Sequence, residues 1–376
     1  MKKVLFFIES LAGGGAERVL TELVSHLDKE KYDVTVCTVT DEGVYQPQME
    51  ACCRYRSLLH VRDYRAGGVK RLLYWLRLRL IYALPAAWVY RLAFREKYDV
   101  EVAFVEGFAT KLMAASTNKT SRKIVWVHTD MQKNPYADRC FASATAHEAA
   151  YRRYDAIACV SGSVKQAFEE KFFAGTQVCV QYNPVDENLI RSRGSEAADQ
   201  SVPCRPLLGT VGRLAEQKGF LRLLRCAAQL KTEGYRFALW IIGEGSQRGE
   251  MERLIAENGL EDTVTLLGYQ ENPHQYMALC DAFVCSSYAE GFSTAATESL
   301  LLGKPVFTVD CAGMRELFGA ENCGEIVENS DEALCEMLRR VVSGQVDFAS
   351  YDAALQRRGE AFRLETRMKE IEELLG

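Results

Sequence analysis

The stretch AFVCSSYAEGFSTAATESLL, residues 282–301, joins a short apolar run to a helical pattern through a polar loop. Its first four residues, Ala282–Cys285, are typical of a buried strand, and residues 294–302 are expected to form a helix. Ser293 precedes that helix and is expected to cap its first turn. A strand that leads directly into a helix is the repeating unit of a parallel sheet that is covered by helices on both faces.

The same alternation of strand and helix runs through the rest of the chain. Strands are expected at residues 4–8, 34–39, 100–105, 124–127, 156–160 and 178–181, and again at 207–211, 238–242, 264–266, 282–285, 306–308 and 325–327. The polar, proline-containing stretch between the two sets has the composition of a linker. We therefore expect an α/β fold of two doubly wound domains that face a central cleft.

The domain boundaries follow from this division of the chain. Residues 1–183 are expected to form the first domain, residues 184–206 the linker, and residues 207–350 the second domain. Residues 351–376 have the pattern of a C-terminal helix, which could pack back on the first domain. In doubly wound sheets ligands bind at the carboxyl ends of the strands.

Composition excludes several classes of protein. The chain has 376 residues, of which 48% are hydrophobic and 26% charged, so it is neither disordered nor a polytopic membrane protein. Its net charge of −5 argues against a nucleic-acid-binding role. The thirteen cysteines form no CxxC pair, which favours free thiols in a reducing, cytoplasmic compartment. The apolar run Val4–Ile8 is too short for a secretory signal.

A basic segment, residues 54–97, contrasts with this acidic average. It holds eleven Lys or Arg residues and two acidic ones, interleaved with leucines and with Trp75 and Trp88. A basic amphipathic helix that carries tryptophan is typical of a surface that contacts anionic lipid. A covering helix of the first domain with solvated arginines is the alternative, and Pro85 interrupts the pattern.

Three further features could bind phosphate or sugar. A glycine triplet, Gly13–Gly15, follows the first strand and opens a helix, so its backbone N–H groups could face an anionic ligand. Arg213 and Lys218 follow the first strand of the second domain, where two cations could hold a diphosphate. His128 ends another strand and could hydrogen bond with a substrate. A tight turn, two solvated cations and a core histidine are the structural alternatives.

The loop and helix of the opening stretch complete this set. The first N–H groups of the helix, near Thr294 and Ala295, lack acceptors within the helix and can bind phosphate oxygens. Glu290 in the loop and Glu298 one turn inside the helix could accept hydrogen bonds from sugar hydroxyls. A capped amphipathic helix with two incidental glutamates is the alternative.

Taken together, these motifs resemble a known family. The chain is similar over nearly its whole length to the GT-B-fold retaining glycosyltransferases of family 4, the glycosyl transferases group 1. The resemblance is carried by the motifs Gly13–Arg18, Val211–Leu214, Lys218-Gly219, Ile242–Gly245 and Glu290–Glu298. It implies two Rossmann-like domains and a nucleotide-sugar donor.

The resemblance also implies roles for residues of the second domain. Arg213 and Lys218 would neutralise the donor diphosphate. Ser293, Thr294 and Ala295 would form the helix start that gives it backbone N–H groups.

The remaining roles concern the nucleoside and the sugars. Glu298 would bind the ribose hydroxyls, Glu290 would contact the transferred sugar, and His128 would lie beside the reacting bond. Backbone groups of Gly268-Tyr269 would pair with the base. Gly14 and Gly15 would lie close to the donor phosphate and the acceptor.

The resulting prediction is transfer of a sugar, with retention, from a UDP-sugar to a hydroxyl of a glycan or lipid-linked acceptor used for cell-wall or capsule synthesis. No Asp-x-Asp motif is present, and neither a metal nor another cofactor is expected. The enzyme is expected in the cytoplasm, where residues 54–97 could hold it peripherally on the inner membrane face. A non-catalytic GT-B-fold partner subunit and an NAD(P)-dependent oxidoreductase are the alternatives, although the glycine loop lacks the GxGxxG order of the latter.

Overall fold

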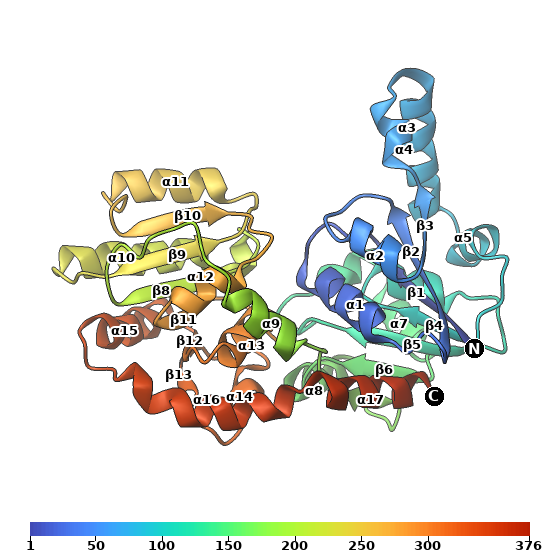
Figure 1. The fold of residues 1–376 in the computed structure, drawn as a ribbon. Helices are drawn as coiled ribbons and strands as arrows, with labels where there is room; N and C mark the ends of the chain where they lie inside the picture. Colours follow the sequence, from blue (N-terminus) through green and yellow to red (C-terminus); the bar gives the residue numbers. More distant parts are fainter. The chain divides into compact units, whose positions relative to one another are not determined.

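The computed structural model describes residues 1–376 and divides them into two compact units (Figure 1). The first unit comprises Met1–Pro184 together with Glu365–Gly376, and the second comprises Val185–Leu364. Each unit is built on one parallel sheet with helices on its faces.

The sheet of the first unit has seven strands in the order β3-β2-β1-β4-β5-β6-β7, and all neighbouring strands are parallel. Its central strands are buried on both faces, as expected for strands that helices cover on both sides. The strands are β1 (Lys2–Ile8), β2 (Tyr32–Thr40), β3 (Arg54–Leu59), β4 (Val100–Ala103), β5 (Arg122–Val127), β6 (Ala156–Cys159) and β7 (Val178–Val180).

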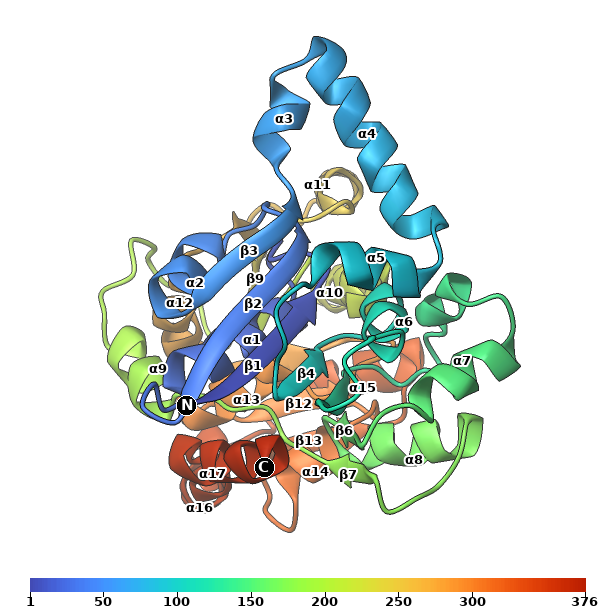
Figure 2. The same cartoon turned by 90° about the vertical axis from the view of Figure 1, so that its right-hand side faces the viewer.

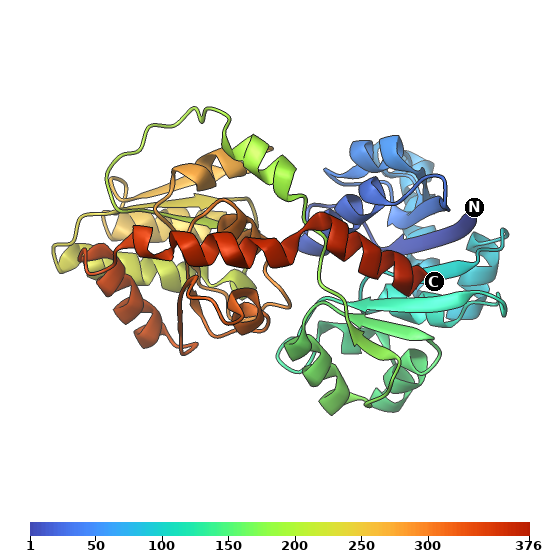
Figure 3. The ribbon, with the colours of Figure 1, turned by 60° about the horizontal axis from the view of Figure 1, so that its bottom comes forward.

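The helices of the first unit connect these strands. They are α1 (Gly15–His26), α2 (Gln46–Cys52), α3 (Val61–Arg65), α4 (Gly68–Ala83), α5 (Ala86–Ala93), α6 (Phe108–Ala114), η1 (Tyr136–Cys140), α7 (Ala144–Tyr151) and α8 (Gly162–Lys171). The C-terminal helix α17 (Leu364–Leu375) also lies on this unit (Figure 3), where the Lys31 Nζ donates a hydrogen bond of 2.8 Å to Glu372 and Arg367 lies 5.0 Å from the ring of Tyr182.

The sheet of the second unit has six parallel strands in the order β10-β9-β8-β11-β12-β13. They are β8 (Leu207–Val211), β9 (Ala238–Ile242), β10 (Val264–Gly268), β11 (Ala282–Cys285), β12 (Val306–Val309) and β13 (Gly324–Val327). Their apolar side chains pack with α10 and α15 into one core, which includes Leu224, Ile241, Val284, Phe307 and Leu338.

The helices of the second unit begin at the positions that the sequence indicates. Ser293 and Ser330 cap two of them, because each hydroxyl accepts a hydrogen bond from the backbone N–H three residues later. The helices are α9 (Glu187–Gly194), η2 (Glu216–Lys218), α10 (Phe220–Thr232), α11 (Arg248–Glu257), α12 (His274–Leu279), α13 (Thr294–Leu301), α14 (Met314–Phe318), α15 (Asp331–Val342), η3 (Phe348–Tyr351), α16 (Asp352–Gly359) and η4 (Glu360–Phe362).

The strand order places the ligand-binding edge of each unit. The order reverses between β1 and β4 in the first sheet and between β8 and β11 in the second. Ligands of open α/β sheets bind beyond the carboxyl ends of the strands at such a reversal. The segments that follow these four strands are therefore the ones in which a site is expected.

Two parts of the chain differ from the sequence prediction. Residues 54–59, the start of the basic segment, form the edge strand β3, which pairs with β2. The range 184–206, expected to be a linker, contains helix α9, whose Ile190 is buried and whose Arg191 hydrogen bonds to the Leu301 carbonyl at 3.4 Å. This helix is part of the second unit.

The rest of the basic segment forms α3, α4 and α5. Helices α3 and α4, which we call the arm (residues 61–83), stand away from the sheet of the first unit (Figures 1 and 2). Helix α4 ends at Ala83, because Pro85 cannot continue it and instead precedes α5. None of the helices combines the length and the apolar character that crossing a bilayer requires.

Candidate active site

Lys218 and Glu290 meet at the carboxyl edge of the second sheet. Lys218 ends η2, which follows β8, and Glu290 lies in the loop after β11, the neighbouring strand. The Lys218 Nζ donates a hydrogen bond of 2.7 Å to Glu290 Oε1, and the Ser287 hydroxyl donates to the same oxygen at 2.6 Å. Burial lowers the pKa of Lys218, but the Glu290 carboxylate outweighs it, so the net pKa is raised. A fixed ammonium group therefore lies at this edge.

Backbone and side-chain hydrogen bonds hold the two loops together around this pair. The Tyr288 N–H donates to the Gln217 carbonyl at 2.8 Å, and the Gln217 side-chain amide donates to the Ala289 carbonyl at 2.8 Å. The Ser286 hydroxyl donates to the Lys218 carbonyl at 3.0 Å. These contacts place the ammonium before any ligand arrives, which is the condition for efficient electrostatic stabilisation.

Arg222, which was not identified from the sequence, supports the loop that follows β11. Its guanidinium is buried and donates to the carbonyls of Ser286 at 2.8 Å and Ser287 at 3.0 Å, and it lies 4.0 Å from the ring centre of Tyr288. Arg225, one turn further along α10, is exposed. The sequence gives no signal that distinguishes the two arginines, since the partners of Arg222 lie in the loop after β11, more than 60 residues away along the chain.

The start of α13 has the predicted geometry. The Ser293 hydroxyl accepts the Ala296 N–H at 3.3 Å, so the cap is confirmed. Thr294 and Ala295 are the first residues of the helix, and their N–H groups have no acceptor within it. The positive end of the helix dipole thus lies in the same loop as Glu290.

Glu298 is almost completely buried. Only 1% of it is exposed, and its Oε2 lies 3.1 Å from Nε2 of His274, the equally buried first residue of α12. His274 was not singled out from the sequence, because nothing in its surroundings along the chain indicates a carboxylate partner.

Arg213 follows β8, Gly268 is the last residue of β10, and Tyr269 follows it. The Arg213 side chain is exposed, and no hydrogen bond or ion pair joins it to Lys218 or Glu290. Gly268 has a φ of +70°, and its carbonyl accepts the Gly243 N–H at 2.8 Å. The Tyr269 side chain is exposed.

His128 lies at the carboxyl edge of the first sheet, directly after β5. Burial lowers its pKa to about 4, and a hydrogen bond to the Phe104 carbonyl opposes this only in part. The ring is therefore neutral near pH 7, and its Nε2 is buried without a partner. A neutral imidazole whose other nitrogen binds a carbonyl presents Nε2 as an acceptor.

Glu106 fixes the backbone of His128 and was missed from the sequence. One carboxylate oxygen accepts the N–H groups of His128 at 2.6 Å and Thr129 at 2.8 Å, and the other accepts the Tyr136 hydroxyl at 2.9 Å. Burial raises the pKa of this carboxyl group. The carboxyl group follows β4, so the topology rather than a local motif brings it to β5.

The low pKa of His128 predicts a contribution to the pH dependence of stability. Between the ordinary pKa of 6.5 and the folded value of about 4, the unfolded chain binds a proton that the folded chain does not. The free energy of unfolding should therefore fall as the pH drops through this window. Chemical denaturation of His128→Asn should show a smaller loss between pH 7 and pH 4 than the unchanged chain; parallel losses in the two proteins would contradict the assignment.

Gly14 and Gly15 form the start of α1, as predicted. Gly14 precedes the helix in an extended conformation, and Gly15 is its first residue. Nothing lies within 4 Å of a Cβ built at Gly15, so the space above this helix start is open. Glu9, which directly follows β1, accepts a hydrogen bond of 2.8 Å from the Tyr82 hydroxyl.

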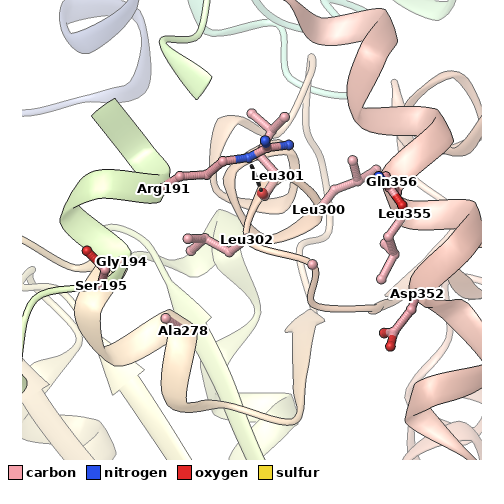
Figure 4. Close-up of a pocket in the computed structure, with 11 residues that line it drawn as sticks. Arg191, Gly194, Ser195, Ala278, Leu300, Leu301, Leu302, Asp352, Leu355 and Gln356 are labelled. Carbon is pink, nitrogen blue, oxygen red and sulfur yellow. Dashed lines mark hydrogen bonds between the residues drawn. The ribbon is translucent and has the colours of Figure 1, made fainter. Parts of the chain in front are cut away.

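A cavity of about 520 Å³ lies elsewhere in the second unit (Figure 4). It contains none of the predicted site residues. Its lining comes from α9, α12, the end of α13 and α16: Arg191, Gly194, Ser195, Ala278, Leu300, Leu301, Leu302, Gly303, Asp352, Leu355 and Gln356.

Comparisons with known proteins bear on both units. The model of Glycosyltransferase Family 4 matches residues 13–189, and that of glycosyl transferases group 1 matches residues 197–361. The N-acetylgalactosamine-N,N'-diacetylbacillosaminyl-diphospho-undecaprenol 4-alpha-N-acetylgalactosaminyltransferase of Campylobacter jejuni is 27% identical over 96% of each chain. The chain belongs to the GT-B glycosyltransferases.

Solved structures agree with the fold of this glycosyltransferase. Anabaena HepE in complex with UDP and glucose has a TM-score of 0.80 at 22% identity and covers 100% of this chain and 99% of its own. TarM of S. aureus has a TM-score of 0.74 at 14% identity, with both chains covered in full. The fold of two Rossmann-like domains is thereby confirmed, and so is the prediction of a glycosyltransferase enzyme.

Proposed function

We propose that this glycosyltransferase moves a sugar from a UDP-sugar to a hydroxyl of a lipid-linked or cell-surface glycan precursor and retains the anomeric configuration. The observation that carries the proposal is the fixed ammonium of Lys218 beside Glu290, in the loop that begins α13. The arrangement combines a cation, a carboxylate for a sugar hydroxyl and the positive end of a helix. These groups can bind the diphosphate and a sugar hydroxyl of a nucleoside diphosphate sugar.

The demanding step is departure of the nucleoside diphosphate. Negative charge grows on its oxygen while positive charge grows on the sugar carbon. Lys218, Arg213 and the N–H groups of Thr294 and Ala295 would stabilise that negative charge as it develops. Glu290, the carboxylate proposed to contact the sugar, has one oxygen held by Lys218 and Ser287, and we assign it to a sugar hydroxyl rather than to covalent attack. We therefore favour attack by the acceptor hydroxyl on the face that the diphosphate leaves, which gives retention.

The other predicted residues would position the two substrates. Glu298, oriented by His274, would accept hydrogen bonds from the ribose hydroxyls. Glu290 would accept a hydrogen bond from a hydroxyl of the transferred sugar. The unpartnered Nε2 of His128 would accept a further hydrogen bond beside the reacting bond.

The backbone would serve the ends of the donor. Gly268-Tyr269 would pair with the base, and the open helix start at Gly14-Gly15 would receive the phosphate and the acceptor.

Two comparisons support the choice of substrates. HepE was crystallised with UDP, with UDP and glucose, and with UDP-glucose, which favours a uridine donor. The name of the Campylobacter relative specifies a diphospho-undecaprenol-linked saccharide as acceptor and an alpha linkage. An acceptor of this kind is held in a membrane, so the enzyme would work at the inner membrane face.

Binding of UDP tests the donor half of the proposal without an acceptor. At a concentration of about 100 times Kd, a ligand of the folded state adds about 2.7 kcal/mol to the free energy of unfolding. Thermal unfolding should therefore shift upward with UDP and not with GDP or ADP at equal concentration. An equal shift with all three would point to a phosphate site without base recognition, and no shift with any of them would overturn the proposal.

Product analysis tests the stereochemistry. UDP-sugars should be incubated with undecaprenyl-diphosphate-linked saccharides, and the anomeric proton coupling of the product measured by NMR. A product of inverted configuration would exclude same-face attack even if UDP binds.

A further inference from the structure

Helix α4 of the arm carries an apolar face that nothing in the structure covers. Five of its residues follow the helical spacing i, i+3, i+4, i+7 and i+11, and we call them the stripe. Each is between 42% and 72% exposed, which is unusual for large aliphatic side chains that lie side by side. The stripe consists of Val69, Leu72, Leu73, Leu76 and Leu80.

The opposite side of α4 is the one that packs on the protein. Tyr74 is its one buried residue, and its ring lies 5.6 Å from that of Tyr64 on α3. At the end of α4, the Tyr82 hydroxyl binds Glu9 and the Tyr82 ring lies 4.4 Å from that of Phe108. These contacts fix the helix to the first unit and leave the stripe turned away from them.

Cations border the stripe on both sides. With about 100° per residue, Arg77 and Lys70 lie along one flank and Arg79 along the other. All three are exposed, and none forms an ion pair. The whole arm contains six Lys or Arg residues and one carboxylate, Asp63, although the complete chain has a net charge of −5.

We propose that the stripe docks α4 on an anionic lipid bilayer. The leucines would enter the boundary between headgroups and acyl chains, and the flanking cations would bind lipid phosphates. A second copy of this chain is a poorer partner, because two arms face to face would bring like charges together on both flanks. The inference rests on the lipid-linked acceptor proposed above. Tyr82 connects the docked helix to Glu9, which directly follows β1 at the edge where we expect the acceptor.

Tryptophan fluorescence provides a direct test. Trp75 on α4 is 53% exposed and Trp88 on α5 is 65% exposed, whereas Trp126 and Trp240 are buried. In a Trp88→Phe variant, Trp75 is therefore the one exposed reporter. Vesicles of equal parts phosphatidylglycerol and phosphatidylcholine should shift its emission to the blue, and brominated lipid should quench it. Pure phosphatidylcholine vesicles and high salt should weaken both effects.

Variants of the stripe decide whether it is the docking surface. In the Leu72→Ser/Leu76→Ser variant the affinity for the anionic vesicles should fall by about 100-fold or more, because each leucine removed from the lipid costs roughly 1.5–3 kcal/mol of transfer free energy. Leu189→Ser, which changes an exposed leucine of the second unit, should leave the affinity unchanged. A thermal unfolding transition close to that of the unchanged chain would show that the double variant is folded.

Two results would overturn the inference. One is vesicle binding by the double variant that equals that of the unchanged chain. The other is a dimer in sedimentation experiments that the double variant abolishes, since the stripe would then be an interface between copies. The shift of thermal unfolding by UDP is measured without lipid. Absence of that shift would contradict the proposed function, whereas the vesicle result would still stand.

Discussion

Replacement of Lys218 by alanine should lower kcat at least about 100-fold. A preorganised donor to a developing negative charge contributes roughly 3–4 kcal/mol to transition-state stabilisation. Lys218 meets the description, because its ammonium is held by Glu290 and its loop by several backbone hydrogen bonds. The rate of UDP release from a saturating UDP-sugar, with and without acceptor, measures the effect.

Lys231→Ala provides the matched control for this prediction. Lys231 belongs to the same unit and also pairs with a carboxylate, Asp262, but that carboxylate is largely exposed. Its loss should leave kcat within a factor of two or so, as expected for a surface ion pair. If Lys218→Ala turns over as fast as Lys231→Ala, the ammonium does not stabilise the leaving group. The proposed mechanism would then be wrong even if UDP still binds.

The pairing of Lys218 with Glu290 shows how far the sequence could predict the site. Each residue was identified from its own motif, one after β8 and one before α13. Their contact across 72 residues follows only from the sheet order, in which β8 and β11 are neighbours. Motifs at the ends of strands can therefore be found in the sequence, whereas the partner of each side chain depends on strand order.

The fold itself was largely predictable because parallel strands that are buried on both faces are continuous apolar runs. The strand that was missed, β3, is an edge strand with the sequence RYRSLL, of which only Leu59 is buried. Its arginines made it resemble the basic helix that follows it. An edge strand pairs with only one neighbouring strand, and more of its side chains stay exposed to solvent. Its sequence is therefore less apolar than that of a central strand.

Buried charged residues were the least predictable part of the site. Glu106 and Arg222 are each 1% exposed, and both act on the backbone of a loop from another strand. A charged residue of this kind has the same sequence signature as an exposed one. Its role depends on N–H or carbonyl groups that tertiary structure brings to it, as the contrast between Arg222 and Arg225 shows.

Replacement of Gly219 by alanine should destabilise the second unit by about 3 kcal/mol or more. Gly219 has a φ of +64°, which costs other residues roughly 1 kcal/mol, and an added Cβ would lie 2.1 Å from the Ser286 carbonyl oxygen. That carbonyl cannot move freely, because buried Arg222 donates to it. The clash must therefore displace the loop that holds Glu290 or unfold α10 at its first turn. Calorimetric unfolding measures the loss.

Alanine substitutions at two other glycines separate the cost of the positive φ from the cost of the clash with the Ser286 carbonyl. Gly234→Ala shares the positive φ, at +90°, but has open space around the new Cβ, so it should cost about 1 kcal/mol. Gly249→Ala lies in α11 with neither constraint and should be neutral or slightly stabilising. If Gly219→Ala costs no more than Gly234→Ala, the Ser286 loop can move aside. The preorganisation of Lys218 would then be weaker than its hydrogen bonds indicate, because the same loop carries its partner Glu290.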